Sequence, residues 1–425
     1  MNGPMHGLRV VEYADERGSY AGKLLADMSA EVIKVEPPEG DPTRRFEPFL
    51  DDEPHPERSL YFWQYNANKQ SVVLDLEGSD AARDAFRRLA ATADFLIESM
   101  PPGRMADLGL DYPDLQPGNE ALIYISITPF GRDMPRANEH ATDLTIFSNG
   151  GVTFMNGYDD HSLPPVRGGG NQAYHTGAHY AVLSGLVALL HRDQTGRGQY
   201  IDVNMNAAAN VTTEAGSYTW LVSKATVQRQ TGRHAAVRPS IPTQVQCADG
   251  KWANTGLPPR KSAEFARTHQ WLEDSGLLDE FLEAPLLLEG AARERIDLSK
   301  LAEDEELQAI FGAGRNAMSF IASKLTAYEF FTGAQERGFQ VGIIYSPEEV
   351  LSDPHFQARQ WPVEVEHPEL GRRFTYPGAP YRFEKSPWSI RRRPPMLGED
   401  TETVLASLGY SPDEVASLSS TDVPG

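Results

Sequence analysis

Hydrophobic positions follow two different periods along the first third of the chain. Short apolar runs that are typical of strands alternate with amphipathic stretches that are typical of helices. The strands are predicted at residues 8–13, 31–36, 71–76, 94–98 and 122–127, and the helices at 20–28 and 80–93. Because such alternation is typical of βαβ units, it predicts an α/β fold with a largely parallel sheet covered on both faces. No GxGxxG follows the first strand and no GxxxxGK[ST] occurs, so the sequence lacks the fingerprints of dinucleotide and P-loop sites.

The middle of the chain predicts a second, smaller domain. A long helix at 176–191 is followed by the turn TGRGQ, a strand at 200–205 and a helix at 206–222. The pattern then changes to helices rich in Ala, Glu, Leu and Arg, after a strand pair around Cys247–Gly256. We therefore expect a large domain from residues 1–223, a small α+β domain from 224–340, and a C-terminal segment, 341–425, that returns to the large domain.

Composition narrows the class of protein. The 425 residues are 40% apolar and 23% charged, as in ordinary globular domains. Lys and Arg number 39 against 60 Asp and Glu, a net charge of −21 that opposes general binding to nucleic acid. Cys247 is the only cysteine, which excludes a disulfide framework and a cysteine metal cluster. The N-terminus lacks a secretory pattern and the apolar stretch Ala181–Leu190 is too short for a bilayer, so we expect a cytoplasmic protein with no membrane partner.

A series of motifs runs through the chain in a definite order. GLRVVEYADERGSYAGKLLADMSAEVIKVEPPEGDPTR begins at Gly7, and YFWQYNANKQSVVLDL begins at Tyr61. ADFLIESMPPGRMADLGLDYPDL, IYISITPFG and GLVALLHRDQTGRGQYIDVNM follow, and SPEEVLSDPHFQARQW, YPGAPYRF and MLGEDT lie near the end. Together the motifs resemble those of the class III CoA-transferases, the family of formyl-CoA transferase and carnitine CoA-transferase. The resemblance spans nearly the whole chain and is weakest in the small domain.

The resemblance implies an interlocked dimer, in which each chain has a large Rossmann-like domain with a parallel sheet, a small domain and long linkers. It also implies coenzyme A and acyl-CoA as substrates, with no metal. In the family an aspartate carboxylate attacks an acyl-CoA thioester to give a mixed anhydride. The CoA thiolate then returns to give an aspartyl-CoA thioester, and an acceptor carboxylic acid completes the exchange. A carboxylate suits this work because both its anhydride and its thioester stay activated.

A tyrosine stands where the family has its nucleophilic aspartate. Counting back from the TGRG turn without a gap puts Tyr174 at this position. The adjacent His175 is not a carboxylate either, and no Asp or Glu occurs between Asp160 and Asp193. Because a phenol offers no carbonyl for a CoA thioester, the family's mechanism does not run on Tyr174.

The loop after the first strand and the loop containing PPG are the family's main CoA-binding segments. With the neighbouring motifs, the resemblance implies that the residues in contact with CoA are Glu16, Arg17, Lys34, Arg44, Lys69, Ser99, Met100, Gly103, Arg104, Met105, Gly169 and Gly170. The family commonly has Asn-Phe-Arg-Pro-Gly in the second loop, whereas this chain has Ser-Met-Pro-Pro-Gly, so Arg104 is the nearest replacement for the missing arginine. The alternative for each of these charges is an ordinary solvated surface position.

Three other features each have two interpretations. Asp143 is either a catalytic carboxylate or a helix N-terminal charge. His175 and His179 stand at i and i+4, but they lack the Glu of HExxH and a third ligand, which favours packing or ligand contact over metal binding. The glycine triplet at 168–170 is either a tight turn or a gate for CoA. Related racemases use a His-Asp pair where this chain has Thr142 and Asp143, so racemase chemistry is disfavoured.

The sequence favours a transferase that moves CoA between an acyl-CoA, such as succinyl-CoA, and a carboxylic acid. Because the nucleophile is missing, we expect a non-catalytic subunit whose related partner carries the aspartate, an arrangement that resembles the succinyl-CoA:benzylsuccinate CoA-transferases. One alternative is a homodimer with different acyl-CoA chemistry at Asp143, Tyr174 or His175. The other is a CoA-thioester-binding protein that is not an enzyme.

Overall fold

The computed structural model describes residues 3–256, 258–301 and 303–419. The described residues form two compact units, neither of which is continuous in sequence. Unit one lies within Met1–Phe154, Val166–Lys224 and Asp353–Gly425, and unit two within Met155–Pro165 and Ala225–Ser352. The sequence predicts the short segment 155–165 as part of the large domain, whereas the ion pair between Asp159 and Arg233 joins it to unit two.

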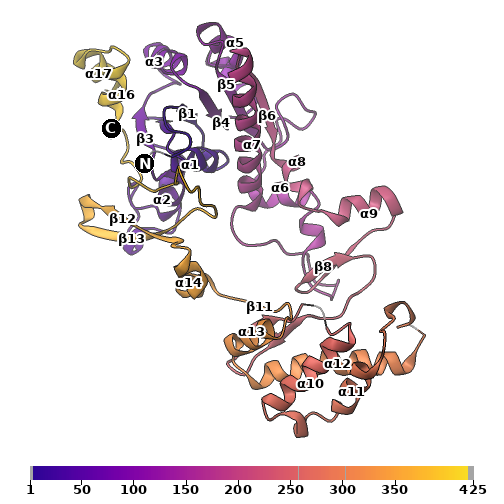
Figure 1. The fold of residues 1–425 in the computed structure, drawn as a ribbon. Helices are drawn as coiled ribbons and strands as arrows, with labels where there is room; N and C mark the ends of the chain where they lie inside the picture. The colour runs from indigo at the N-terminus through magenta and orange to yellow at the C-terminus, as the bar shows by residue number, and fades with distance from the viewer. Residues whose placement is uncertain (1–2, 257, 302, 420–425) are drawn as a thin grey trace. The chain divides into compact units, whose positions relative to one another are not determined.

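Unit one is built on a six-stranded parallel sheet (Figure 1). Its strands are β1 (Arg9–Tyr13), β2 (Glu31–Glu36), β3 (Gln70–Val73), β4 (Phe95–Glu98), β5 (Ile123–Thr128) and β6 (Tyr200–Asn204). They lie in the order β3-β2-β1-β4-β5-β6, and every neighbouring pair is parallel. The predicted α/β class is therefore confirmed. The strand order reverses between β1 and β4, and the loops after these two strands flank the crevice where open α/β sheets bind ligands.

Helices cover both faces of this sheet. On one face lie α1 (Ser19–Asp27), α6 (Asp143–Asn149), α7 (Gln172–Thr195) and α8 (Met205–Val211), whose apolar residues pack on the sheet in one core. On the other face lie α3 (Asp80–Ala91), α4 (Arg104–Asp107), α5 (Tyr112–Leu115), α16 (Thr401–Ser407) and α17 (Pro412–Ser419), which enclose a second core. Buried apolar residues on both faces explain why the strands read as continuous hydrophobic runs.

The C-terminal segment covers the edge of the sheet at β3. The Ser71 N–H donates to the Asp400 carboxylate at 3.0 Å, and the Ser71 hydroxyl accepts from the Gly398 N–H at 2.8 Å. The Val73 N–H donates to the Thr401 hydroxyl at 3.0 Å. These contacts satisfy donors that an edge strand would otherwise expose.

A two-stranded hairpin lies beside α2 (Leu60–Asn66) in unit one. Its strands are β12 (Pro362–His367) and β13 (Arg372–Pro377), and they follow α15 (Pro354–Ala358). Trp63 of α2 stacks on His367 of the hairpin, with ring centroids 4.2 Å apart. No strands were expected here, because prolines stand at the outer ends of both strands and in the turn between them, although residues 363–367 alternate.

Two helix predictions differ from the structure. The helix predicted at 176–191 is longer, since α7 spans Gln172–Thr195 and therefore includes Tyr174. The single helix predicted at 206–222 is wrong: α8 ends at Val211, and α9 (Ala215–Ser223) begins after Glu214, which has φ of +46°. The Thr212 and Thr213 hydroxyls donate to backbone carbonyls three residues back, and such bonds compete with helix continuation.

Unit two combines a small sheet with a helical layer. Its strands are β7 (Gln228–Gln230), β8 (Arg233–Ala236), β9 (Gln244–Gln246), β10 (Trp252–Asn254) and β11 (Gly342–Ile343), and its helices are α10 (Ser262–Asp274), α11 (Ala284–Ala292), α12 (Glu305–Lys324), α13 (Ala327–Glu336) and α14 (Pro347–Ser352). Strands β9, β10 and β11 form one sheet, and β7 and β8 form a hairpin. Its core contains the stacked rings of Trp271 and Phe330. Across both units, no helix of the described residues is long and apolar enough to cross a membrane.

Candidate functional site

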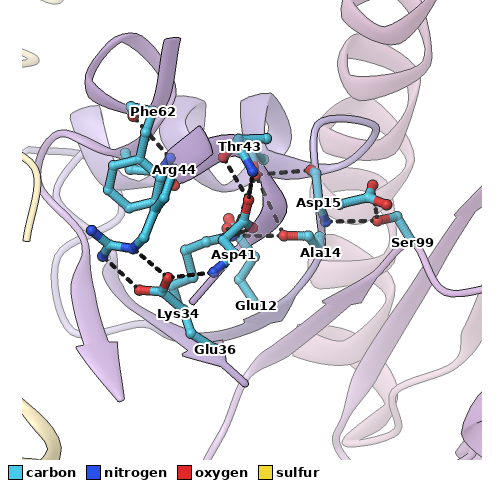
Figure 2. A network of polar contacts seen from close by, with 12 residues as sticks. Glu12, Ala14, Asp15, Lys34, Glu36, Asp41, Thr43, Arg44, Phe62 and Ser99 are labelled. Atoms are coloured by element: carbon cyan, nitrogen blue, oxygen red, sulfur yellow. Dashed lines mark hydrogen bonds and ion pairs between the residues drawn. The ribbon is translucent and has the colours of Figure 1, made fainter. Parts of the chain in front are cut away.

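A buried network of charges lies under the loop that follows β1 (Figure 2). Glu12 on β1 accepts from Lys69 with both carboxylate oxygens, at 2.9 and 2.8 Å, and pairs with Lys34 at 3.2 Å. The Lys34 ammonium also reaches Asp41 and the Ala14 carbonyl, each at 2.6 Å. Helix α1 approaches the network at Gly22, where any Cβ would collide with the Glu12 carboxylate. The network therefore requires a glycine at this point of the helix.

A third cation, Arg44, extends the network to the end of β2 at Glu36. The Arg44 guanidinium binds Glu36 through two hydrogen bonds of 2.7 and 2.8 Å, and it pairs with Glu57 at 2.8 Å. Its carbon lies 3.8 Å from the centre of the Phe62 ring. Both charged side chains of the Arg44–Glu36 pair are fully buried. Such a pair holds only while both partners are present, because an unpaired buried charge is costly.

The pKa values of the two buried lysines are shifted in opposite directions. Burial lowers the pKa of each ammonium group. At Lys34 the carboxylates of Asp41 and Glu12 outweigh burial, so its pKa is raised. At Lys69 burial and the nearby Lys34 charge outweigh Glu12, so its pKa falls to about 8.

Three of the cations that the resemblance implies as CoA contacts are thus paired with carboxylates of the protein. The side chains of Lys34, Arg44 and Lys69 are at most 1% exposed. Their contact with CoA stays a prediction, which this arrangement does not favour. In the structure these three cations fix the loops around them.

The loops after β1 and β4 are tied together by Asp15 and Ser99. The Ser99 hydroxyl donates to the Asp15 carboxylate at 2.8 Å and accepts from the Asp15 N–H at 3.0 Å. The same carboxylate accepts from the Arg17 guanidinium, with Nε at 2.9 Å. Glu16 lies half-buried in this loop, and burial together with the charge of Asp15 raises its pKa to about 6. Both loops flank the switch point between β1 and β4.

The PPG loop leads from β4 into α4. The Met100 N–H donates to the Glu98 carboxylate at 2.7 Å, and Gly103 has φ of +87°, which suits glycine. Met105 is 2% exposed and belongs to the core beneath the loop. The Arg104 side chain is 39% exposed and pairs with Glu77. Of the predicted CoA contacts in this loop, Arg104 is the charged group that remains accessible.

Tyr174 and Asp143 join α6 and α7 through reciprocal hydrogen bonds. The Asp143 N–H, in the first turn of α6, donates to the Tyr174 hydroxyl at 3.0 Å. The Asp143 carboxylate accepts from the Ala173 N–H at 2.8 Å and pairs with Arg167. The Asp143 carboxylate therefore lies at the N-terminal turns of both α6 and α7. This supports the interpretation of Asp143 as a helix N-terminal charge. Tyr174 is 6% exposed, and burial with the charge of Glu16 raises its pKa to about 12.

His175 belongs to an aromatic group rather than to a metal pair. Its Nε2 lies 2.9 Å from the Tyr65 hydroxyl, and its ring lies 4.3 Å from that of Tyr20. Burial and the neighbouring His179 lower the pKa of His175, so the ring is neutral at pH 7. Within the described ranges no group of three or more His, Cys, Asp or Glu has the geometry for a metal ion.

The glycine triplet at 168–170 precedes α7 and is exposed to solvent. A Cβ at Gly169 or Gly170 would meet nothing within 4 Å. Gly170 has φ of +78°, and its carbonyl accepts from Arg167 at 2.9 Å. The turn interpretation of the triplet fits this geometry, while its role as a gate stays a prediction.

The comparison with protein families decides the identity of this arrangement. The model of CoA-transferase family III matches residues 5–401. The chain belongs to CoA-transferase family III. The resemblance drawn from the motifs is therefore confirmed.

Curated relatives and a solved structure agree with the assignment to CoA-transferase family III. The chain is 33% identical over 410 residues to the succinyl-CoA:(R)-benzylsuccinate CoA-transferase subunit BbsE of Thauera aromatica, covering 96% of this chain and 95% of that protein. It is 30% identical over 411 residues to the succinate–glutarate CoA-transferase of Agrobacterium fabrum, covering 95% and 96%. The crystal structure of a CAIB/BAIF family protein from Brucella suis matches with a TM-score of 0.77 at 27% identity, covering 96% and 100%.

Sequence reasoning missed Glu98, Arg167 and Tyr65, which the structure places next to predicted residues of this family III chain. Arg167 pairs with Asp143, Tyr65 with His175, and Glu98 with the backbone of the PPG loop. One signal was available for Glu98: a charged residue ends a strand that is otherwise fully apolar. The other two contacts join distant parts of the chain and leave no local pattern.

We expect Arg44→Met to destabilise the protein by about 3–5 kcal/mol, because the change leaves Glu36 buried without its cation. The measurement is the free energy of unfolding from urea titration of the full chain. The matched control is Arg87→Met, whose side chain is 41% exposed and pairs with an exposed Asp84, so its loss should stay below about 1 kcal/mol. Equal losses for the two variants would contradict the role assigned to the buried pair.

Proposed function

We propose that this chain is the subunit of a heteromeric CoA-transferase that lacks the nucleophile, and that a related subunit supplies it. The complex moves CoA between an acyl-CoA, such as succinyl-CoA, and a carboxylic acid. The observation that carries the proposal is Tyr174, a protonated phenol at the nucleophile's position on α7. The relative from Thauera aromatica is itself named as a subunit, which supports the same arrangement.

The chemistry of the exchange explains why a tyrosine does not replace the carboxylate. In the first step a carboxylate oxygen attacks the thioester carbon, the C–S bond breaks, and CoA leaves as a thiolate. In the second step that thiolate attacks the carbonyl of the enzyme's own carboxyl group, and the acyl group departs as a free acid. A phenol has no carbonyl to receive the thiolate. The pKa of about 12 also keeps Tyr174 protonated at neutral pH.

In this proposal CoA lies along the loops after β1 and β4. Met100 and Gly103 contact it through the backbone, and Arg104 turns from Glu77 toward a phosphate. Ser99 is fully buried and acts by holding the loop to Asp15. The exposure of Arg104 supports this choice over the buried lysines. Exposed glycines at 169 and 170 leave room for the acyl end of the ligand, because no side chain fills the space above them.

An exposed apolar face on α7 supports the need for a partner. The side chains of Tyr180, Leu183, Val187 and Leu190 recur at helical spacing and are 37–63% exposed. In helix α9, Tyr218, Trp220, Leu221 and Val222 are 54–69% exposed. Exposed apolar side chains that gather on one element in this way mark protein interfaces. We assign this face to the related subunit.

A second candidate function rests on Glu16. This carboxyl group lies close enough to Tyr174 to raise the pKa of the phenol, and its own pKa of about 6 leaves it ionised at pH 7. A homodimer that uses Glu16 as its own nucleophile would catalyse the exchange without a second subunit. The following experiments distinguish the two candidates.

The first test measures CoA exchange between succinyl-CoA and free carboxylic acids. We expect no exchange with the chain alone, and exchange when it is co-expressed with a paralogue that has aspartate at the position of Tyr174. Replacing that aspartate by asparagine should abolish the activity, whereas Tyr174→Phe in this chain should leave most of it. Exchange by the chain alone would overturn the proposal in favour of Glu16 or another internal nucleophile.

The second test restores a carboxylate. Tyr174→Asp should gain weak acylation by acyl-CoA, detected by mass spectrometry as a hydroxylamine-sensitive adduct on residue 174. The gain should be weak because the carboxylates of Asp143 and Glu16 disfavour a further negative charge. Tyr174→Asn is the matched control and should form no adduct. An adduct on Glu16 or Asp143 of the wild type would show that the chain has its own nucleophile.

The third test addresses the apolar face. The double variant Leu183→Asp/Val187→Asp should abolish co-purification of the related subunit, since it places two charges in an apolar contact. Gln194→Asp, an exposed polar position near the end of α7, is the control and should leave co-purification intact. Retention of the partner by the double variant would move the interface elsewhere.

A further inference from the structure

Glu98 differs from the other buried acids of the protein. Among the described residues seven carboxylate side chains are buried, and six of them form an ion pair: Glu12, Asp27, Glu36, Asp41, Asp111 and Asp143. Glu98 is 3% exposed and has no ion-pair partner within the described part of the chain. A buried carboxylate without a cation is costly when charged, and it tends to bind a proton instead. Such groups occur more often at functional sites than elsewhere.

The surroundings of Glu98 explain why no cation neutralises the charge of its carboxylate. Ser126, at the adjacent position of β5, donates a hydrogen bond to its carboxylate, and Tyr13 occupies the adjacent position of β1. The cation whose charge acts on Glu98 is Arg132, which binds Asp111 with two nitrogen atoms and is neutralised by it. Tyr124 and Tyr200 belong to the same group of interacting side chains.

These contacts place the titration of Glu98 near neutrality. Burial is the main cause that raises its pKa, to about 7, and Asp111 contributes in the same direction. The hydrogen bonds from Ser126 and the Met100 N–H, and the charge of Arg132, act in the opposite direction. Near pH 7 the carboxyl group is therefore partly protonated.

The loop above Glu98 is the one that the proposed function assigns to CoA. The Glu98 carboxylate holds the Met100 N–H at 2.7 Å, which fixes the start of this loop. Ser99, which lies between Glu98 and Met100, donates to the Asp15 carboxylate. The backbone held by Glu98 is therefore joined to the loop after β1. A polyanion on this loop makes the charged form of Glu98 less favourable, since like charges raise the pKa of a carboxyl group.

We propose that Glu98 is a positioning residue that holds the loop of residues 99–103 and takes up a proton when a phosphate-bearing ligand, CoA itself, binds there. The inference rests on the proposed function in its choice of ligand. Protonated Glu98 still accepts the Met100 N–H through its carbonyl oxygen, so the loop keeps its geometry while the buried charge disappears. Binding and proton uptake are then coupled at one residue that touches no reacting atom.

The test is calorimetric titration of the full-length chain with CoA between pH 6 and 8, in buffers of different ionisation enthalpy. Wild type should lose about three- to tenfold more affinity over this range than Glu98→Gln, whose neutral amide keeps the acceptor at every pH. It should also take up more protons on binding at pH 7.5. The phosphates of CoA gain or lose protons equally in the experiments with the two proteins. The difference between wild type and Glu98→Gln therefore reports on Glu98.

The matched control is Glu77→Gln, which removes an exposed carboxylate beside the same loop and should keep the pH dependence of the wild type. If the affinity of Glu98→Gln for CoA depended on pH as that of the wild type does, the proposal would be overturned. Hydrogen exchange at the Met100 amide tests the link without CoA: its protection should be kept in Glu98→Gln, which retains an acceptor, and lost in Glu98→Ala, which removes it. If CoA does not bind, the proposed function fails, and full protection of the Met100 amide in Glu98→Ala would show separately that Glu98 does not control the loop.

Discussion

The bonds of the Glu12 carboxylate to two buried lysines hold together the part of the molecule where ligands of this fold class bind. Glu12 is on β1, Lys34 on β2, and Lys69 precedes β3, so one carboxylate joins three strands of the sheet. Their ammonium groups also bind the Ala14 and Ser19 carbonyls, which fix the loop after β1 and the start of α1. A core of apolar side chains would hold the strands equally well, but it would offer these carbonyls no ammonium donor. The network therefore specifies the loop conformation, in addition to any contribution to stability.

The start of α7 shows how the helix N-terminus is satisfied with a tyrosine at position 174. A nucleophilic carboxylate near a helix N-terminus would be held by backbone N–H groups. In this chain Asp143 accepts those N–H groups, and the Tyr174 hydroxyl accepts a backbone N–H of α6. The donors are satisfied from a neighbouring helix and by a phenol, so α6 and α7 stay joined although no carboxylate stands at position 174.

Much of the architecture could be read from the sequence, because parallel strands buried on both faces are continuous apolar runs. Five of the strands and the helices α1 and α3 follow from that pattern within a few residues. The hairpin at 362–377 was missed although its first strand alternates, because prolines at the ends of the strands are typical of loops. The break at Glu214 could not be read either, since it depends on side-chain bonds to the backbone. For the site, residue types located the loops after β1 and β4 and drew attention to Tyr174. They did not separate Arg104, which is exposed, from Arg44, which is buried, because burial depends on contacts between distant segments.

The return of the C-terminal segment to β3 has a consequence for the synthesis of the protein on the ribosome. Ser71 and Val73 emerge early, whereas Gly398, Asp400 and Thr401, which complete their hydrogen bonds, emerge more than three hundred residues later. Until then the edge of the nascent sheet has unpaired N–H groups. The polypeptide must therefore pass through a long interval in which β3 is open to pairing with another chain. Chaperone protection during translation would matter most in that interval.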